Sequence, residues 1–336
     1  MPFSRQKSAL AILFAISALM LSAAASGAQD EARTPAARAA RQTPEPHGPQ
    51  LAGDRVTLPL VLINGFPFVE GAINGKRGKL LFDIGETEAL TVDSHTVPAS
   101  GGIPTGHGFF GSGEKFDVVS FPTIRSLSLP GELRYADMTN IQGNPGLPLE
   151  QQITPDFIGW LGVHFFAGYV ARIDYAAPSV TFFRDDASGS GEKAALAGEH
   201  VLYTIPLSTK DRYGLVNFQA QVGSLKVLGS LDTGSANTMW LEHGQLTNLL
   251  RDGTLTVHHE PGDKEDHYTL HDLVVDGHPM PPMPVDITNG APPMLKVMTR
   301  HDLPVLMLGY EFLKQFRIVL DYDGRTLALL SLKQRT

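Results

Sequence analysis

The stretch Gly229-Ser-Leu-Asp-Thr-Gly-Ser-Ala-Asn-Thr-Met-Trp-Leu241 carries the strongest pattern in the chain. One acidic residue, Asp232, stands at the end of an apolar run and is followed by a small Thr-Gly-Ser turn. An acid in this setting supplies half of what acid–base chemistry with two carboxyl groups requires. If Asp232 belongs to such a pair, we expect a second acid in a similar setting elsewhere in the sequence.

A second stretch of this kind lies 149 residues earlier, where Asp83-Ile-Gly85 follows Lys79-Leu-Leu-Phe82. Other matches recur in the same order at offsets of 147 or 149 residues. Several matches in one order at nearly one offset indicate an internal duplication. The remaining matches pair Pro59-Leu60 with Pro206-Leu207, Asp137-Met-Thr-Asn140 with Asp286-Ile-Thr-Asn289, Leu161-Gly162 with Leu308-Gly309, and Asp174-Tyr175 with Asp321-Tyr322.

The duplication divides the chain into segments. We expect an N-terminal lobe at 52–185 and a C-terminal lobe at 200–336, joined by a linker at 186–199. The Ser-Gly-Ser-Gly composition within that segment is typical of a linker. Residues 1–28 are predicted to be a signal peptide and residues 29–51 a disordered tether.

The signal-peptide prediction rests on a basic start, Arg5 and Lys7, followed by an apolar run from 9 to 25. Small residues near Ala25 and Ala28 offer cleavage sites. An uncleaved membrane anchor is the alternative, although the apolar run is short for a span. Cleavage predicts a periplasmic or secreted protein without stable membrane insertion, and the sequence leaves open whether 29–51 is a pro-segment.

Composition narrows the function classes. The chain has 336 residues, of which 42% are hydrophobic and 18% charged, so a folded soluble body of two lobes is expected. The net charge of −8 and the lack of a basic patch argue against nucleic acid as a partner. The absence of Cys excludes disulfides, thiolate catalysis and Cys-based metal sites.

The local patterns are those of short strands. Asn74-Gly75 predicts a hairpin within 67–83, and Gly223-Ser224 predicts its counterpart within 216–232. Longer hairpins are expected at 106–129 and 254–277. Short helices are expected at 162–169 and 309–316, each followed by a strand. The predicted class is all-β with minor helix.

The Asp-Thr-Gly-Ser turn after an apolar strand resembles the active-site signature of pepsin-like and retropepsin-like aspartic proteases. The later apolar run at 305–309, which ends in Gly before a short helix, adds to the resemblance. The resemblance covers both repeats; the second motif is specific and the first is degenerate. It implies two homologous retropepsin-like lobes, acid-protease-like barrels, with a cleft between them. It also implies peptide-bond hydrolysis by two acids and a water molecule, with no cofactor and no metal.

Residue by residue, the resemblance implies that Asp83 and Asp232 are the catalytic pair. Two carboxyl groups held close together cannot both ionise cheaply, so they share one proton. The resemblance makes Gly85 and Gly234 the turn glycines of the active-site loops. It gives Thr233 a buried hydroxyl that ties one loop to the other, and has the Ser235 hydroxyl bond the outer oxygen of Asp232.

Two residues of the first motif depart from the family pattern. Ile84 has no hydroxyl, so a reciprocal link between two threonines cannot form and Thr233 must find another acceptor. Glu86 replaces a small hydroxyl residue. Pointing inward, it would raise the proton affinity of the acid pair; pointing outward, it would be harmless.

These departures leave alternatives beside the favoured function, an aspartic endopeptidase acting as a monomer on peptides or unfolded protein segments. The first alternative is a catalytically weak or inactive protein that binds peptides or a protein partner in the same cleft. The second is a symmetric dimer in which Asp232 of two chains would pair.

Two of the predicted hairpins contain candidate functional residues. The first, at 106–129, is a candidate flap over the cleft, with His107, Phe109 and Phe110 as candidate substrate contacts. The second carries four histidines, of which two have a spacing that suits a metal on a helix. On a strand that spacing places them about 13 Å apart, so a solvated hairpin is favoured over a metal site. The histidines are His258, His259, His267 and His271.

Overall fold

The computed structural model describes residues 15–16, 49–110, 115–208, 216–259, 265–290 and 303–332. These residues form mainly β-strands with a few short helices, which confirms the predicted class. The predicted signal peptide and tether lie outside the described residues, apart from 15–16 and 49–51. Ala15–Ile16 forms β1, a two-residue strand paired with β7. Among the described helices, none combines the length and apolar character needed to cross a bilayer.

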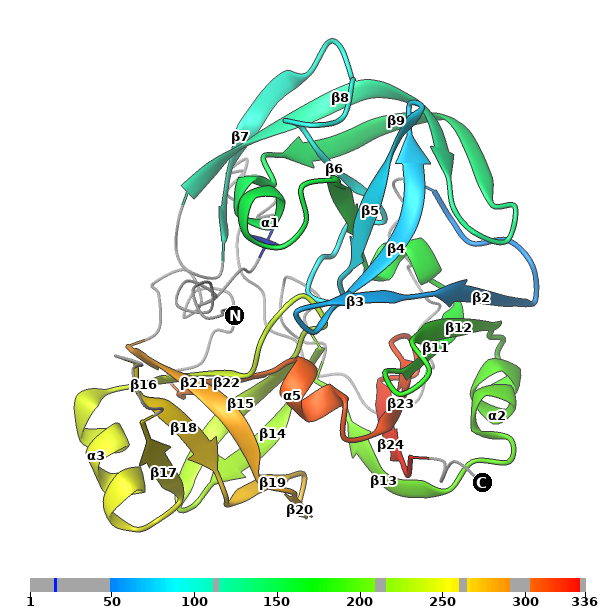
Figure 1. Cartoon of the computed structure of the whole chain (residues 1–336). Helices are drawn as coiled ribbons and strands as arrows, with labels where there is room; N and C mark the ends of the chain where they lie inside the picture. Colours follow the sequence, from blue (N-terminus) through cyan, green and yellow to red (C-terminus); the bar gives the residue numbers. More distant parts are fainter. Residues whose placement is uncertain are drawn as a thin grey trace, which may run out of the picture.

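The described strands form three sheets (Figure 1). The first sheet, at the top of the figure, has nine strands in the order β1-β7-β8-β9-β6-β10-β5-β4-β3. After β1, its strands are β3 (Val61–Ile63), β4 (Phe66–Ile73), β5 (Lys76–Phe82), β6 (Thr91–Asp93), β7 (Ile103–Phe110), β8 (Lys115–Ser128), β9 (Arg134–Asn144) and β10 (Phe157–Leu161).

The third sheet, at the lower left of Figure 1, also has nine strands, in the order β17-β18-β21-β16-β22-β15-β14-β19-β20. All of them come from the second repeat. They are β14 (Val216–Val222), β15 (Leu225–Leu231), β16 (Thr238–Leu241), β17 (Leu255–His258), β18 (His267–Leu270), β19 (Leu273–Val275), β20 (His278–Met280), β21 (Met283–Asn289) and β22 (Val305–Leu308).

The two nine-stranded sheets contain the same run of neighbours. The order β8-β9-β6-β10-β5-β4 in the first corresponds to β18-β21-β16-β22-β15-β14 in the third. Strand senses also agree, since β10 runs parallel to β5 and antiparallel to β6, as β22 does to β15 and β16. The topology is therefore repeated, in agreement with the internal duplication in the sequence.

The second sheet joins the two halves. Its order is β13-β24-β23-β11-β12-β2, and β11 of the first half pairs with β23 of the second. One face of this sheet belongs to an apolar core that contains residues of both halves. The six strands are β2 (Arg55–Pro59), β11 (Tyr169–Asp174), β12 (Ser179–Arg184), β13 (Val201–Pro206), β23 (Arg317–Asp321) and β24 (Thr326–Leu330).

The predicted hairpins are present. β4 and β5 meet at Asn74 and Gly75, whose φ angles of 49° and 82° suit a two-residue turn with left-handed residues. β14 and β15 pair on either side of Gly223. β7 pairs with β8, and β17 pairs with β18, although the turn of each of these hairpins lies outside the described residues.

The helices are short. η1 (Val163–Phe166) and α5 (Tyr310–Leu313) occupy the predicted helical positions. α1 (Leu147–Gln152) and α3 (His243–Arg251) were not expected from the sequence. The linker also differs from expectation, since it contains α2 (Ser190–Leu196). Its Glu-Lys-Ala-Ala-Leu run has high helix propensity, and Ala195 packs in an apolar cluster on the outer face of the second sheet.

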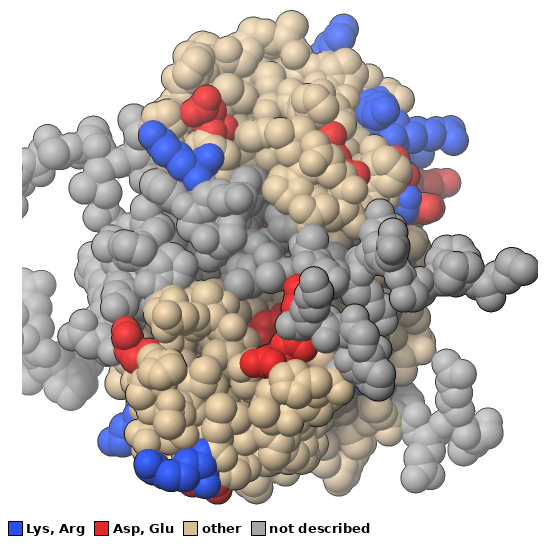
Figure 2. Space-filling model, turned by 60° about the vertical axis from the view of Figure 1, so that its left-hand side comes forward, with Lys and Arg blue, Asp and Glu red and all other residues tan. Residues whose placement is uncertain are grey.

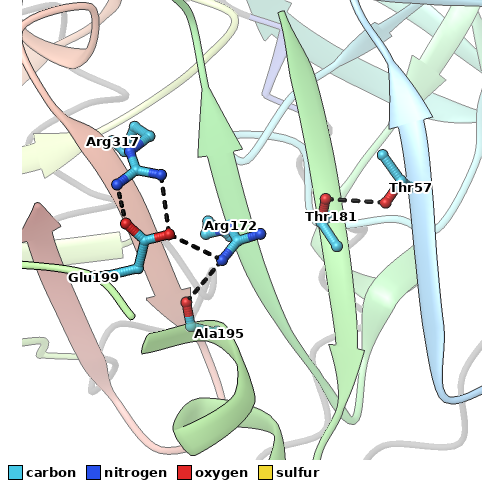
Figure 3. A network of polar contacts seen from close by, with 6 residues as sticks. All are labelled: Thr57, Arg172, Thr181, Ala195, Glu199 and Arg317. Atoms are coloured by element: carbon cyan, nitrogen blue, oxygen red, sulfur yellow. Dashed lines mark hydrogen bonds and ion pairs between the residues drawn. The ribbon is translucent and has the colours of Figure 1, made fainter. Parts of the chain in front are cut away.

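A buried ionic network follows α2 and spans the junction of the halves (Figure 3). Glu199, only 1% exposed at its side chain, binds Arg317 of β23 through two N–H groups and Arg172 of β11 through one, at 3.3 Å. The hydroxyls of Thr57 and Thr181 meet at 3.0 Å between β2 and β12. The linker therefore binds strands of both repeats with one carboxylate.

Candidate active site

The two repeated acids occupy equivalent positions. Asp83 follows β5 and Asp232 follows β15. The amide of Asp83 donates to the carbonyl oxygen of Leu161 at 2.9 Å, and that of Asp232 donates to Leu308 at 3.1 Å. Leu161 and Leu308 end the parallel strands β10 and β22. Each acid is therefore held where two parallel strands end together.

The two carboxyl groups meet. The side chains of Asp83 and Asp232 are hydrogen-bonded to each other, and the residues are 3% and 4% exposed. Within each loop, a glycine amide donates to the acid two residues before it. The distances are 2.8 Å from Gly85 to Asp83 Oδ1 and 2.7 Å from Gly234 to Asp232 Oδ1. The structure thus brings together the acids and glycines identified in the sequence.

The glycines also pack against the opposite acid. A Cβ atom on Gly85 would lie 2.6 Å from Oδ2 of Asp232, and one on Gly234 would lie 2.5 Å from Oδ2 of Asp83. These distances leave no room for a side chain. Each loop therefore needs glycine at this position so that the carboxyl group of the other repeat can approach.

Thr233 links the loops with one hydroxyl. Its Oγ1 atom accepts a hydrogen bond from the amide of Ile84 at 3.0 Å and donates to the carbonyl oxygen of Phe82 at 2.6 Å. Thr233 is fully buried and Ile84 is 1% exposed. The missing hydroxyl at Ile84 therefore does not leave Thr233 without partners, because backbone groups of the first loop satisfy it.

Glu86 lies inside the protein. The residue is fully buried, and its Oε1 atom accepts a hydrogen bond from the amide of Glu88 at 2.9 Å. Glu88 in turn accepts a hydrogen bond from the Gln142 side chain at 3.0 Å. Glu86 therefore has the inward orientation, and its charge acts on the acid pair by raising the pKa of Asp232.

Ser235 corresponds to Glu86 in the second repeat, and its hydroxyl does not take the expected partner. It donates to the carbonyl oxygen of Ala236 at 2.7 Å instead of Asp232. A hydroxyl has one hydrogen to donate, and a neighbouring carbonyl competes well for it. The main chain of Ser235 keeps a positioning role, since its carbonyl oxygen accepts the amide of Tyr310 at 3.2 Å.

Burial raises the pKa of both Asp83 and Asp232. In Asp232 the negative charge of Asp83 and their hydrogen bond raise the pKa further, and Glu86 acts in the same direction. In Asp83 the hydrogen bonds from Asp232 and from the loop amides oppose the effect of burial. The pair therefore retains one proton above the pH at which isolated carboxyl groups ionise.

Tyr175 is a neighbour of the pair that the sequence did not single out as functional. Its hydroxyl is buried and has no hydrogen-bond partner among the described residues. Burial and the charges of Asp232 and Asp83 raise its pKa. Its ring contacts that of Tyr310, with centroids 5.5 Å apart. The sequence signal that could have identified Tyr175 is the recurrence of Asp-Tyr in both repeats, at Asp174-Tyr175 and Asp321-Tyr322.

The candidate flap is described only in part. His107 lies on β7, is exposed, and contacts Asp117 on β8 at 2.8 Å. Phe109 and Phe110 belong to β7 by their backbone, but their side chains lie outside the described residues. The structure therefore describes the two strands of the hairpin. Phe109 and Phe110 stay candidate substrate contacts predicted from the sequence.

The histidines of the second long hairpin take separate partners. His258 and His267 face each other across β17 and β18, with rings 5.6 Å apart. His259 contacts Asp266 at 3.1 Å, and His271 contacts Thr256 at 2.8 Å. Within the described ranges, no group of three or more His, Asp or Glu side chains is placed to hold a metal ion.

One face of the molecule shows how charge is distributed (Figure 2). On this face the described Lys and Arg side chains lie toward the upper and lower ends, and acidic side chains also occupy the middle.

No protein-family model matches the chain, and no curated protein matches it at a significant level of sequence similarity. The functional assignment therefore rests on the geometry of the site.

Proposed function

We propose that the protein is an aspartic endopeptidase in which Asp83 and Asp232 activate one water molecule for attack on a peptide bond. One observation carries the proposal: two buried carboxyl groups from the two repeats are hydrogen-bonded to each other. Each is also held by the glycine amide of its own loop. Such a pair contains an acid and a base at the same pH.

The chemistry follows from the shared proton. The ionised carboxylate accepts a proton from water as the water oxygen bonds to the carbonyl carbon, and the protonated carboxyl group protonates the carbonyl oxygen. Collapse of the tetrahedral gem-diol breaks the C–N bond: one carboxyl group delivers a proton to the departing amine, and the other accepts the proton of a gem-diol hydroxyl, so the pair regains its shared proton. The proton belongs to the pair, so the two roles are not assigned to separate residues.

The substrate we propose is an extended peptide or an unfolded protein segment. Extended chains bind to sheet edges by main-chain hydrogen bonds. The β7–β8 hairpin is the candidate flap, with His107, Phe109 and Phe110 as candidate contacts. We further propose action as a monomer in the periplasm or outside the cell, after removal of residues 1–28.

The test is cleavage of a chemically unfolded test protein between about pH 3 and pH 8, the range over which a carboxyl pair titrates. Asp83→Asn and Asp232→Asn should each abolish cleavage while circular dichroism shows an intact fold. Asp137→Asn, at an exposed acid of the first repeat, is the control and should cleave like the wild type. Wild-type protein that cleaves nothing would overturn the proposal.

Two other outcomes would identify the alternatives. Full activity in Asp83→Asn with none in Asp232→Asn would point to a dimer that pairs two copies of Asp232. Peptide binding without cleavage would point to a binding protein. The buried Glu86 carboxyl group beside the pair is the observation that favours this second candidate, because it adds negative charge where a family member carries a small hydroxyl residue.

A further inference from the structure

We propose that Tyr310 is a positioning residue for the candidate active site: its ring packs against two turns of the first repeat and keeps the loop of Asp232 against that of Asp83. Tyr310 begins α5 of the second repeat and is half-buried. In Figure 1, α5 lies below the end of the first sheet that carries β3. This role rests on the proposed function only in treating the two acids as one proton-sharing pair. It concerns their geometry and not the cleavage step.

The start of α5 is fastened to the active-site loop of its own repeat. The first amides of a helix have no partner within the helix. The amide of Tyr310 donates to the carbonyl oxygen of Ser235 at 3.2 Å. The side-chain oxygen of Asn237 accepts the amides of Gly309 at 2.8 Å and Phe312 at 3.3 Å. A displacement of α5 therefore moves the residues that follow the second acid.

The ring of Tyr310 reaches the first repeat and fits against a glycine. β3 and β4 are joined by the Asn64-Gly65 turn, whose φ angles of 52° and 87° are left-handed. A Cβ atom on Gly65 would lie 2.5 Å from Cδ1 and 2.6 Å from Cγ of Tyr310. Glycine leaves room for the ring because it has no Cβ atom. The ring is therefore in direct contact with this turn.

Tyr175 is the second contact of the ring in the first repeat. The rings of Tyr175 and Tyr310 meet edge to face, with centroids 5.5 Å apart and planes at 65°. Such pairs are attractive. Tyr175 is 6% exposed and directly follows β11. Its turn is fixed by Asp174, whose Oδ1 atom accepts the amides of Ala176 at 2.9 Å and Ala177 at 3.0 Å. Tyr310 therefore contacts two well-fixed turns of the first repeat.

The first repeat has no matching ring at the corresponding position. The offset of 147 residues pairs Tyr310 with Val163. The amide of Val163 donates to the carbonyl oxygen of Glu86 at 2.9 Å, so the main-chain bond to the active-site loop is common to both repeats. Val163 itself is an aliphatic residue of the apolar core. The ring of Tyr310 is the added element, and it joins the second loop to the first repeat.

The expected consequence is electrostatic. Asp83 and Asp232 share a proton because their carboxyl groups are held together away from water. Without the ring, the loop of Asp232 loses its contact with the first repeat through α5, so the carboxyl groups can separate and admit water. Both changes favour the ionised form of Asp232, whose pKa is raised by burial and by the charge of Asp83. Loss of the Tyr310 ring should therefore weaken proton binding by the pair.

The test is an NMR titration of the full chain, read from isotope-labelled Asp carboxyl carbons and assigned with Asp83→Asn and Asp232→Asn. Tyr310→Ala should bind the shared proton at least about tenfold more weakly than the wild type, and Tyr310→Phe should match the wild type. Tyr203→Ala is the control and should leave the titration unchanged. Tyr203 is also half-buried, and it stacks on His278 of another sheet with centroids 4.7 Å apart.

A second pair of variants displaces the ring without removing it. Gly65→Ala places a methyl group against the ring of Tyr310. Gly75→Ala is the matched control, because Gly75 belongs to the same kind of Asn-Gly turn, with a φ of 82°, and nothing lies within 4 Å of its added Cβ atom. Both variants strain a left-handed residue. Weaker proton binding in Gly65→Ala alone therefore reports the ring, and adding Tyr310→Ala should cancel the difference between the glycine variants.

Unchanged proton binding in both Tyr310→Ala and Gly65→Ala would overturn this role, and so would equal changes in Gly65→Ala and Gly75→Ala. If Tyr310→Ala does not fold, the two glycine variants decide. Cleavage is a separate readout: in an active enzyme, Tyr310→Ala should lower kcat with little change in KM, because the ring acts on the acids. A wild type that cleaves nothing, with the titrations as expected, would overturn the proposed peptidase and support the role of Tyr310.

Discussion

The hydroxyl oxygen of Thr233 accepts a hydrogen bond from the amide of Ile84, its counterpart in the other repeat, at 3.0 Å. The same hydroxyl donates to Phe82, so one side chain satisfies two backbone groups of the opposite loop. Thr233→Val should lower the free energy of unfolding by about 1–3 kcal/mol, because both groups lose their partner in a buried place. Urea denaturation measures this. Thr233→Ser keeps the hydroxyl and should lose less; equal losses would contradict the role of the bond.

Close approach of the two loops gives a prediction for glycine. Gly85→Ala would place a methyl group against the Asp232 carboxyl group, 2.6 Å from Oδ2. We expect a loss of about 1–3 kcal/mol in stability, since the carboxyl groups must separate. Gly244→Ala is the control, because nothing lies within 4 Å of its added Cβ atom in α3. The control should be neutral or more stable by up to about 1 kcal/mol.

Protonation of Asp232 gives a pH dependence of stability. Its pKa is raised well above 3.8, so the contribution of the protonated form is present below that value and lost as the pH rises through the folded pKa. Asp232→Asn cannot ionise. Its melting temperature should therefore exceed that of the wild type near pH 8, and the difference should shrink near pH 4. Parallel curves of melting temperature against pH would contradict the raised pKa.

The charge of Glu86 gives a prediction for activity under the proposed function. Glu86 raises the pKa of Asp232, so Glu86→Gln should lower it. The upper limb of the pH–rate profile should move toward acid, while the lower limb moves less. Glu88→Gln changes the next acid of the same hydrogen-bonded loop and serves as the comparison. An unshifted upper limb in Glu86→Gln would remove Glu86 from the proton balance of the pair.

The ionic network of Glu199, Arg172 and Arg317 predicts a large loss of stability when the charge of Glu199 is removed. Glu199→Gln removes the charge that balances Arg172 and Arg317 and should lower the free energy of unfolding by about 3–5 kcal/mol. Thr57→Val removes the nearby hydroxyl contact with Thr181 and should lower it by about 1 kcal/mol. Urea denaturation of both variants checks the order. A smaller loss in Glu199→Gln than in Thr57→Val would contradict the assignment.

Features that repeat or are local could be predicted from the sequence. Asn74-Gly75 defined its hairpin because the turn type requires left-handed residues there. The offset between Asp83 and Asp232 paired two acids that the structure joins by a hydrogen bond. Both predictions use patterns that are independent of the rest of the chain.

Features that arise from pairing across long separations could not be predicted. Nothing in the linker sequence shows that Glu199 meets Arg172 and Arg317, because β11 and β23 become neighbours only in the folded sheet. The resemblance pairs the Ser235 hydroxyl with Asp232, whereas the hydroxyl donates to the carbonyl oxygen of Ala236, one residue away.

The Thr233 hydroxyl links the two loops without a reciprocal hydroxyl at Ile84, and this asymmetry has a consequence for how two repeats can diverge. In an assembly of two identical subunits, any substitution appears on both sides of the symmetry axis, so a threonine opposite an isoleucine is unattainable. Fusion of the two copies into one gene removes that restriction. One loop carries the hydroxyl that joins the two loops, and the corresponding positions of the other loop carry Ile84 and Glu86. Symmetry-breaking substitutions of this kind are open only to a covalently joined pair.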